Sequence, residues 1–289
     1  MEPINKQPLK ERLEAYKRNP FSLFLAVLVV LSAAVTLTVL IALIVYILAK
    51  GIPNLRPELF EWDYNTTNVS MMPAIINTLT ITAMTLVFAV PSGIFSAIYL
   101  VEYARRGNPF IKVVRMTTET LSGIPSIVFG LFGYLFFNIY LGWGYSILGG
   151  ALTLAIMVLP LIMRTTEEAL QSVPDAFREG SFGLGAGKLR TVFRVVLPSA
   201  VPGILAGVIL AVGRIVGETA ALLYPAGTAA EVANGFFSSG RTLAVHMYAL
   251  LNEGLYMEQA YATAVVLLVL VVGINALSSF IAKKAGVKQ

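Results

Sequence analysis

The chain has 289 residues, of which 57% are hydrophobic and only 13% are charged. An ordinary soluble domain carries about 25% charged residues, so the composition favours a protein surrounded by lipid. The formal net charge is +5, and the absence of cysteine excludes disulfide bonds and metal sites built from thiolates. The apolar residues form continuous runs instead of the alternating segments, each of about ten residues, that are typical of a membrane β-barrel.

Six apolar runs are long enough to cross a bilayer as helices, which takes about 20 residues. The first run is too long for the apolar part of a signal peptide and lacks a convincing cleavage site, so we expect it to be a retained helix. The sequence therefore predicts an all-α integral membrane protein with six transmembrane helices within residues 21–282. The runs cover residues 21–49, 73–101, 121–140, 146–163, 201–224 and 259–282.

Lys and Arg are unevenly divided between the segments that flank these runs. Seventeen lie in the two terminal segments and in loops 102–120 and 164–200, whereas the opposite loops contain three. Because basic residues accumulate on the cytoplasmic side of membrane proteins, we expect a cytoplasmic N-terminal segment (1–20), a cytoplasmic tail (283–289) and a cytoplasmic 164–200 loop. This distribution accounts for the positive charge, so the sequence indicates membrane lipid as a partner and no nucleic acid.

The long 164–200 loop is expected to contain two short helices. Ser172 and Asp175 have the spacing of a capping box, which predicts a helix over 174–184. Two glycines, 185 and 187, suit the left-handed position that often ends a helix.

In the segment that follows, KLRTVFRVVLP, apolar residues recur with helical spacing and predict a second helix with one apolar stripe. Pro198 is expected to prevent Leu197 from continuing as regular helix. The stripe consists of Leu189, Val192, Phe193 and Val196.

The glycine-rich stretch GLGAGK between these helices has three possible interpretations. A phosphate-binding P-loop is excluded because Phe182 stands where its first glycine belongs and Leu189 where its Ser or Thr belongs. An amphipathic hairpin at the membrane surface is a common alternative. The third interpretation is a docking element that transmits motion from a soluble partner, and the residues alone leave the last two open.

The spacing of the polar loop resembles the EAA loop of ATP-binding-cassette (ABC) importer permeases, whose pattern is E-A-A, three residues, Gly, nine residues, I-x-L-P. The chain has Gly and Ser for the two alanines and Val for Ile. The matching residues are Glu179, Gly180, Ser181, Gly185, Val195, Leu197 and Pro198.

This resemblance implies a type I importer permease with the MetI-like fold. In that family the loop forms a coupling helix that seats in a cleft of an ATPase subunit. The chain itself would then be no enzyme and would hold no cofactor, since ATP and Mg would be used by the partner ATPase.

Two charged residues, Arg214 and Glu218, fall inside the fifth run. Charges in a membrane helix are costly and usually face protein or a water-filled path. Four residues apart on one helical face, the two could form a structural ion pair. Alternatively, Arg214 could bind a small oxyanion through parallel hydrogen bonds while Glu218 holds it until the anion arrives. Two G-x-x-x-G pairs, 203/207 and 213/217, predict close packing of neighbouring helices along the same run.

Three further stretches narrow the resemblance to PstA-type permeases of phosphate-specific importers: GRIVGETAALLYPAG, LSGIPSIVFGLFGY and TLAVHMY. The permease resemblance covers about residues 70–285. It implies a bacterial inner membrane location and a substrate path near Arg214 and Glu218. The implied partners are a PstC-type permease, two copies of an ATPase subunit and an external phosphate-binding protein. Importers for sulfate, molybdate or phosphonate share much of this scaffold and remain alternatives for the anion.

Weaker signals come from Ser122, Ser126 and His246. The two serines open the third run, where a helix start could present N–H groups to an anion, although a kinked and closely packed helix is the commoner interpretation. His246 is the only histidine, and we expect it to be packed or hydrogen-bonded rather than a metal ligand. A short helix is expected around residues 242–251.

Two classes of protein compete with the permease. A secondary transporter would usually contain repeated halves, which the sequence does not show convincingly. A membrane scaffold or sensor subunit would use Arg214 and Glu218 only for structure.

Overall fold

The computed structural model describes residues 20–105 and 107–284, with side chains as far as residue 280. The segments expected to be cytoplasmic at the two termini, 1–20 and 283–289, fall almost entirely outside this range. The chain separates into two compact units, Met1–Lys50 and Gly51–Gln289. Every regular element in the described residues is helical, in agreement with the all-α prediction.

The first unit contributes the long helix α2, which runs from Pro20 to Gly51 and covers the predicted run 21–49. Its only charged residue is Lys50. A helix that is apolar around its whole circumference is typical of one surrounded by lipid.

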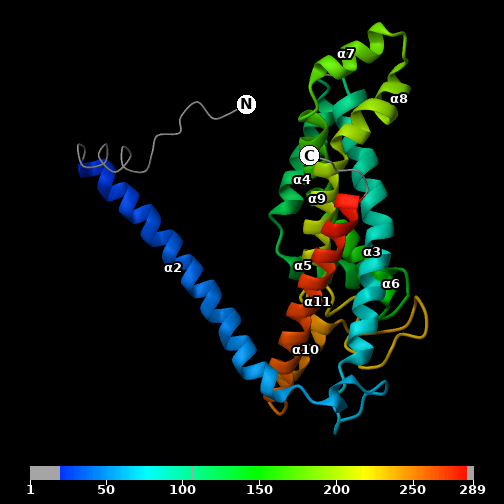
Figure 1. Cartoon of the computed structure of the whole chain (residues 1–289). Helices are drawn as coiled ribbons and strands as arrows, with labels where there is room; N and C mark the ends of the chain where they lie inside the picture. Colours follow the sequence, from blue (N-terminus) through cyan, green and yellow to red (C-terminus); the bar gives the residue numbers. More distant parts are fainter. Residues whose placement is uncertain (1–19, 106, 285–289) are drawn as a thin grey trace. The chain divides into compact units, whose positions relative to one another are not determined.

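In the second unit, α3, α6, α9 and α11 lie side by side (Figure 1). Helices α7 and α8 lie at one end of this bundle, called the α7 end below, and α10 lies at the opposite, α10 end. The elements are η1 (Ile52–Asn54), η2 (Pro57–Phe60), α3 (Met72–Ile98), η3 (Tyr99–Tyr103), α4 (Pro109–Ser122), α5 (Ser126–Gly133), η4 (Tyr134–Tyr140), α6 (Ile147–Gln171), α7 (Asp175–Gly183), α8 (Lys188–Thr191), η5 (Val192–Val196), α9 (Leu197–Val216), α10 (Leu243–Glu253) and α11 (Met257–Lys284).

Among residues 20–105 and 107–284, five helical stretches are long and apolar enough to cross a membrane, and the bent pair α4 and α5–η4 makes the sixth candidate. The two parts of this pair meet at 104°. The third run, predicted as one helix over 121–140, is therefore broken. Pro125 has no N–H group and disfavours helical geometry for the residue before it, which explains why α4 ends at Ser122 and α5 begins at Ser126.

Helix α6 is the centre of the second unit, with α3 packed on one side and α9 on another. It is longer than the predicted run 146–163. The main apolar core includes Leu154, Val158 and Ile162 of α6, each almost fully buried. A second core cluster at the α7 end combines residues of α3, α6, η5 and α9.

The predicted close packing at the first G-x-x-x-G pair is confirmed. Gly203 lies against Ala169 and Gly207 against Thr165, both residues of α6. A side chain at either glycine would hold the two helices apart. Gly213 of the second pair has only Asn275 of α11 nearby, so this pair is less tightly packed.

Helix α9 continues without a break from η5, contrary to the expectation that Pro198 would interrupt regular helix at Leu197. Leu197 has helical angles, and its N–H bonds to the carbonyl of Val192 five residues earlier, in π-helical geometry. The wider turn accommodates a proline that cannot donate a backbone hydrogen bond. At the other end, α9 stops at Val216, eight residues before the predicted end at 224.

Residues 217–242 form an irregular cap at the α10 end. Asn77 of α3, which is 1% exposed, anchors this cap by donating to the carbonyls of Glu231 and Arg241 and accepting from Ala233 N–H. The short helix expected around 242–251 is confirmed as α10, whose first turn is capped by Thr242.

Candidate coupling surface and membrane charges

The loop that resembles the EAA motif folds as α7, a tight turn and α8. Gly185 has φ of +81°, the left-handed conformation that was predicted, whereas Gly187 has φ of −73° and precedes α8 as its N-terminal cap. The predicted capping box is wrong. Ser172 still belongs to the end of α6, and its hydroxyl donates to Ala169 O at 2.8 Å, so it is turned away from α7.

Large apolar side chains are exposed around this turn. Leu184, at the tip, is 91% exposed, and no residue of α7 is buried. The predicted stripe on the following helix is divided, because Val192 and Val196 enter the core at the α7 end whereas Leu189 and Phe193 face outward. Clustered exposed apolar residues mark interaction sites. The outward set is Phe177, Phe182, Leu184, Leu189 and Phe193.

The motif residues divide between outward-facing and structural positions. Glu179, Gly180, Gly185 and Pro198 are exposed. The hydroxyls of Ser181 and Thr191 lie 2.8 Å apart and join α7 to α8. Val195 and Leu197 are half-buried where η5 runs into α9.

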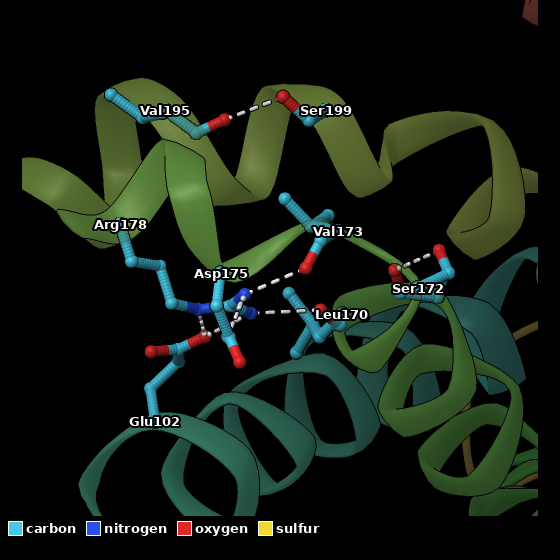
Figure 2. A network of polar contacts seen from close by, with 9 residues as sticks. Glu102, Leu170, Ser172, Val173, Asp175, Arg178, Val195 and Ser199 are labelled. Atoms are coloured by element: carbon cyan, nitrogen blue, oxygen red, sulfur yellow. Dashed lines mark hydrogen bonds and ion pairs between the residues drawn. The ribbon is translucent and has the colours of Figure 1, made fainter. Parts of the chain in front are cut away.

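Arg178, beside the motif glutamate, makes contacts that sequence analysis missed (Figure 2). Its Nε and Nη2 donate to Glu102 Oε1 at 3.1 and 2.8 Å, and the same guanidinium reaches the carbonyls of Leu170 and Val173. A further bond joins Nη1 to Asp175. No local pattern could have indicated this cluster, because Glu102 lies 76 residues away in sequence and two acceptors are backbone atoms.

Arg214 and Glu218 do not share a helical face as predicted. Arg214 is exposed in the last turn of α9, but Glu218 follows Gly217, the residue that caps the helix. Glu218 Oε1 instead accepts from Ala221 N–H at 3.2 Å. Within residues 20–105 and 107–280, Arg214 makes no ion pair. The spacing of four residues would have paired the charges only if the helix had continued.

Ser122 and Ser126 flank the sharp bend between α4 and α5. The hydroxyl of Ser122 donates to Thr118 O at 2.9 Å inside α4, and Ser126 is the half-buried first residue of α5. Neither serine makes a hydrogen bond to Arg214 or Glu218 in the part of the chain that is described. A role in the substrate path stays a prediction for all four residues.

His246 is fully buried at the α10 end, as expected, but neither ring nitrogen has a hydrogen-bond partner among the described residues. Its ring packs edge-on against Tyr64, and the guanidinium of Arg241 lies 4.7 Å from the centre of the same Tyr64 ring. Burial and the nearby Arg241 charge lower the pKa of His246 to about 3. The described residues contain no group of three side chains suited to hold a metal ion.

This low pKa predicts a loss of stability in acid. The unfolded chain binds a proton at His246 near pH 6.5 and the folded chain only near 3, so the protein is expected to lose stability as the pH falls from about 6.5 towards 3. At pH 5 the effect is of the order of 2 kcal/mol relative to His246→Gln. Thermal unfolding of both proteins in detergent at pH 5 and 7.5 measures the difference. Equal acid sensitivity of the two proteins would contradict it.

Comparison with known proteins supplies the family. Residues 89–286 match the family described as binding-protein-dependent transport system inner membrane component. The match covers more than half of the chain, which therefore belongs to this family of multi-pass inner membrane proteins.

Individual relatives agree with this membership. The chain is 36% identical to the probable ABC transporter permease protein YqgI of Bacillus subtilis, over 78% of this chain and 81% of that protein. It is 37% identical to the phosphate transport system permease protein PstA of Mycobacterium leprae, over 65% of this chain and 62% of the relative. The PstA of Pasteurella multocida is 40% identical over 62% of this chain and 64% of its own length.

Solved structures confirm the predicted fold class. A chain of the bacterial alginate ABC transporter, crystallised with a periplasmic protein bound to an alginate pentasaccharide, superimposes with a TM-score of 0.69 at 15% identity, covering 93% of this chain and 97% of that one. A chain of the MetNI methionine ABC transporter gives a TM-score of 0.57 at 20% identity, covering 74% and 93%. At these identities the likeness concerns the fold, which is that of an ABC importer permease.

Proposed function

We infer that the chain is a PstA-type permease subunit of an ABC importer for inorganic phosphate. The observation that carries the importer assignment is the exposed apolar surface of α7 and its turn, which continues through α8 and η5 into the transmembrane helix α9. A secondary transporter would have no partner for such a surface. The assignment of phosphate rests on the PstA relatives, which are 37% and 40% identical to this chain.

The partners follow from the number of coupling surfaces. One chain presents one such surface, whereas a pair of ATPase subunits needs two, so a second permease of the PstC type completes the assembly. ATP and Mg are used by the two ATPase copies, and an external phosphate-binding protein delivers the anion. Closure of the ATPase pair would move α7 and switch the spanning helices between outward and inward access.

This arrangement requires the α7 end to be cytoplasmic and the α10 end to be external. The basic residues support that orientation, since Lys188, Arg190 and Arg194 lie at the α7 end and Arg241 alone belongs to the cap at the other. Both termini are then cytoplasmic.

Arg214 is proposed to lie on the anion's route. An exposed Arg in a spanning helix needs a protein or aqueous environment, and its guanidinium can bind a tetrahedral oxyanion through two hydrogen bonds. Replacement Arg214→Gln is expected to lower phosphate uptake by at least about tenfold, because loss of a charged hydrogen bond costs about 1.5–3 kcal/mol. Uptake and ATP hydrolysis are measured in liposomes that contain the complete complex.

Arg164→Gln is the control, since Arg164 is exposed and, in the described part of the chain, forms an ion pair only with Glu168 on its own helix. Preserved phosphate uptake in Arg214→Gln would contradict the placement of Arg214 on the anion's route.

Competition by sulfate, molybdate and phosphonate for phosphate uptake in the native complex tests the identity of the anion independently. Uptake that proceeds without the ATPase would instead indicate a secondary transporter.

A further inference from the structure

Arg178 uses its whole hydrogen-bonding capacity to join α7 to the bundle. A guanidinium group has five N–H donors, and the side chain makes five hydrogen bonds. The acceptors come from three places: Glu102 in η3, the carbonyl of Leu170 in the last turn of α6, and the loop and first turn that lead into α7 (Figure 2). A saturated guanidinium is held in one orientation, so it fixes the position of the helix that carries it.

The central ion pair is largely shielded from water. The side chains of Arg178 and Glu102 are 15% and 8% exposed, with Nη2 and Oε1 2.8 Å apart. In contrast, the side chain of Asp175 is 79% exposed, so its ion pair with Arg178 lies at the solvent-exposed edge of the cluster. An ion pair that is mostly buried and fully hydrogen-bonded resists separation far better than an exposed one, because breaking it leaves an uncompensated charge.

Other contacts between α7 and the bundle are few. The helix buries no residue, and its packing partners are α8 and η5, which lead into α9. The carbonyls that Arg178 binds belong to Leu170 and Val173, whose side chains are part of the core at the α7 end, together with Ile98 of α3. Arg178 therefore links α7 to η3 and α3 through Glu102, and it reinforces the short connection to α6 that residues 172–174 make along the chain. Neither link passes through α9.

We propose that Arg178 is a positioning residue that makes α7 move as one body with the ends of α3 and α6. A push on α7 then reaches α3 through Glu102, in addition to α6 and α9, to which α7 is joined along the chain. This inference rests on the proposed importer function. Lysine could not replace arginine, because a single ammonium group cannot reach a carboxylate and two separate carbonyls in this geometry.

The test compares coupling in the complete complex reconstituted in liposomes. Arg178→Lys and Glu102→Gln are expected to lower the phosphate imported per ATP hydrolysed by at least about fivefold, while the complex still assembles and hydrolyses ATP. The matched control is Arg164→Lys in the exposed pair with Glu168, whose side chains are 72% and 65% exposed, and it should leave the ratio unchanged. An unchanged ratio in Arg178→Lys would overturn the proposal, whereas a native complex that imports no phosphate would count against the proposed function.

A second measurement does not depend on transport. The chain has no cysteine, so spin labels can be attached at Ala176→Cys and Phe95→Cys, which are exposed positions on α7 and on α3 outside the outward apolar set. In the assembled complex, the distribution of distances between the labels is expected to be narrow with Arg178 and broader with Arg178→Lys. Equal widths would overturn the proposal, and the Glu102→Gln protein serves for both measurements if the lysine variant does not assemble.

Discussion

Replacing Leu184 with aspartate is expected to weaken binding of the ATPase subunit strongly without disturbing the fold of the permease. Leu184 is 91% exposed at the tip of the turn after α7, so it contributes almost nothing to packing within the chain. Burial of a leucine in a partner's cleft is worth about 1.5–3 kcal/mol, and burial of a carboxylate in its place adds a desolvation cost. We expect the affinity for the ATPase to fall by about 30-fold or more.

Co-purification of the ATPase and titration of its binding to the permease in detergent measure this effect. The thermal unfolding temperature of the isolated permease should not change. A matched control is Leu255→Asp, which changes an equally apolar residue, 80% exposed, at the opposite end of the bundle. The docking surface would be misassigned if Leu184→Asp bound the ATPase with native affinity, or if Leu255→Asp weakened binding equally.

Gly207→Ala is expected to destabilise the second unit, whereas Gly213→Ala in the same helix is not. A Cβ atom at position 207 would lie 2.6 Å from Thr165 Cβ, and no rotation of the Thr165 side chain can relieve that overlap. The Thr165 hydroxyl also bonds to Leu161 O at 2.9 Å, which restrains it further. Forced separation of α6 and α9 should cost about 1–3 kcal/mol.

At position 213 the nearest atom to an added Cβ is Asn275 Nδ2 at 3.6 Å, an ordinary contact. Alanine there should be neutral or should stabilise the helix by up to about 1 kcal/mol. Thermal unfolding of Gly207→Ala and Gly213→Ala in detergent measures the predicted difference in stability. Equal stability of the two would show that α6 and α9 can separate without cost, contrary to the packing at Gly207.

The sequence by itself determined the class of protein and much of the secondary structure. Hydrophobic runs place the spanning helices because a bilayer requires about 20 apolar residues in succession, a property that each run carries alone. The resemblance of Glu179, Gly185 and Pro198 to the EAA loop indicated the candidate coupling surface, and the left-handed geometry of Gly185 followed from the preference of glycine for that conformation. These are local properties, and they need no knowledge of distant residues.

Other local rules were overridden by the rest of the chain. Pro198 was expected to interrupt a helix, but the π-helical turn before it keeps the backbone helical while Val192 and Val196 pack into the core. The spacing of Arg214 and Glu218 indicated an ion pair only on the assumption of unbroken helix, and that assumption fails at Gly217.

Only the tertiary structure decided which distant polar groups meet. Arg178 and Glu102 are separated by 76 residues, and Asn77 binds backbone groups more than 150 residues away. Backbone carbonyls and amides occur at every position, so a side chain that binds them leaves no pattern in the sequence. The turn that carries the candidate coupling surface could therefore be predicted from the sequence, whereas the contacts that hold it to the bundle could not, because they arise where α3, α6 and α7 converge.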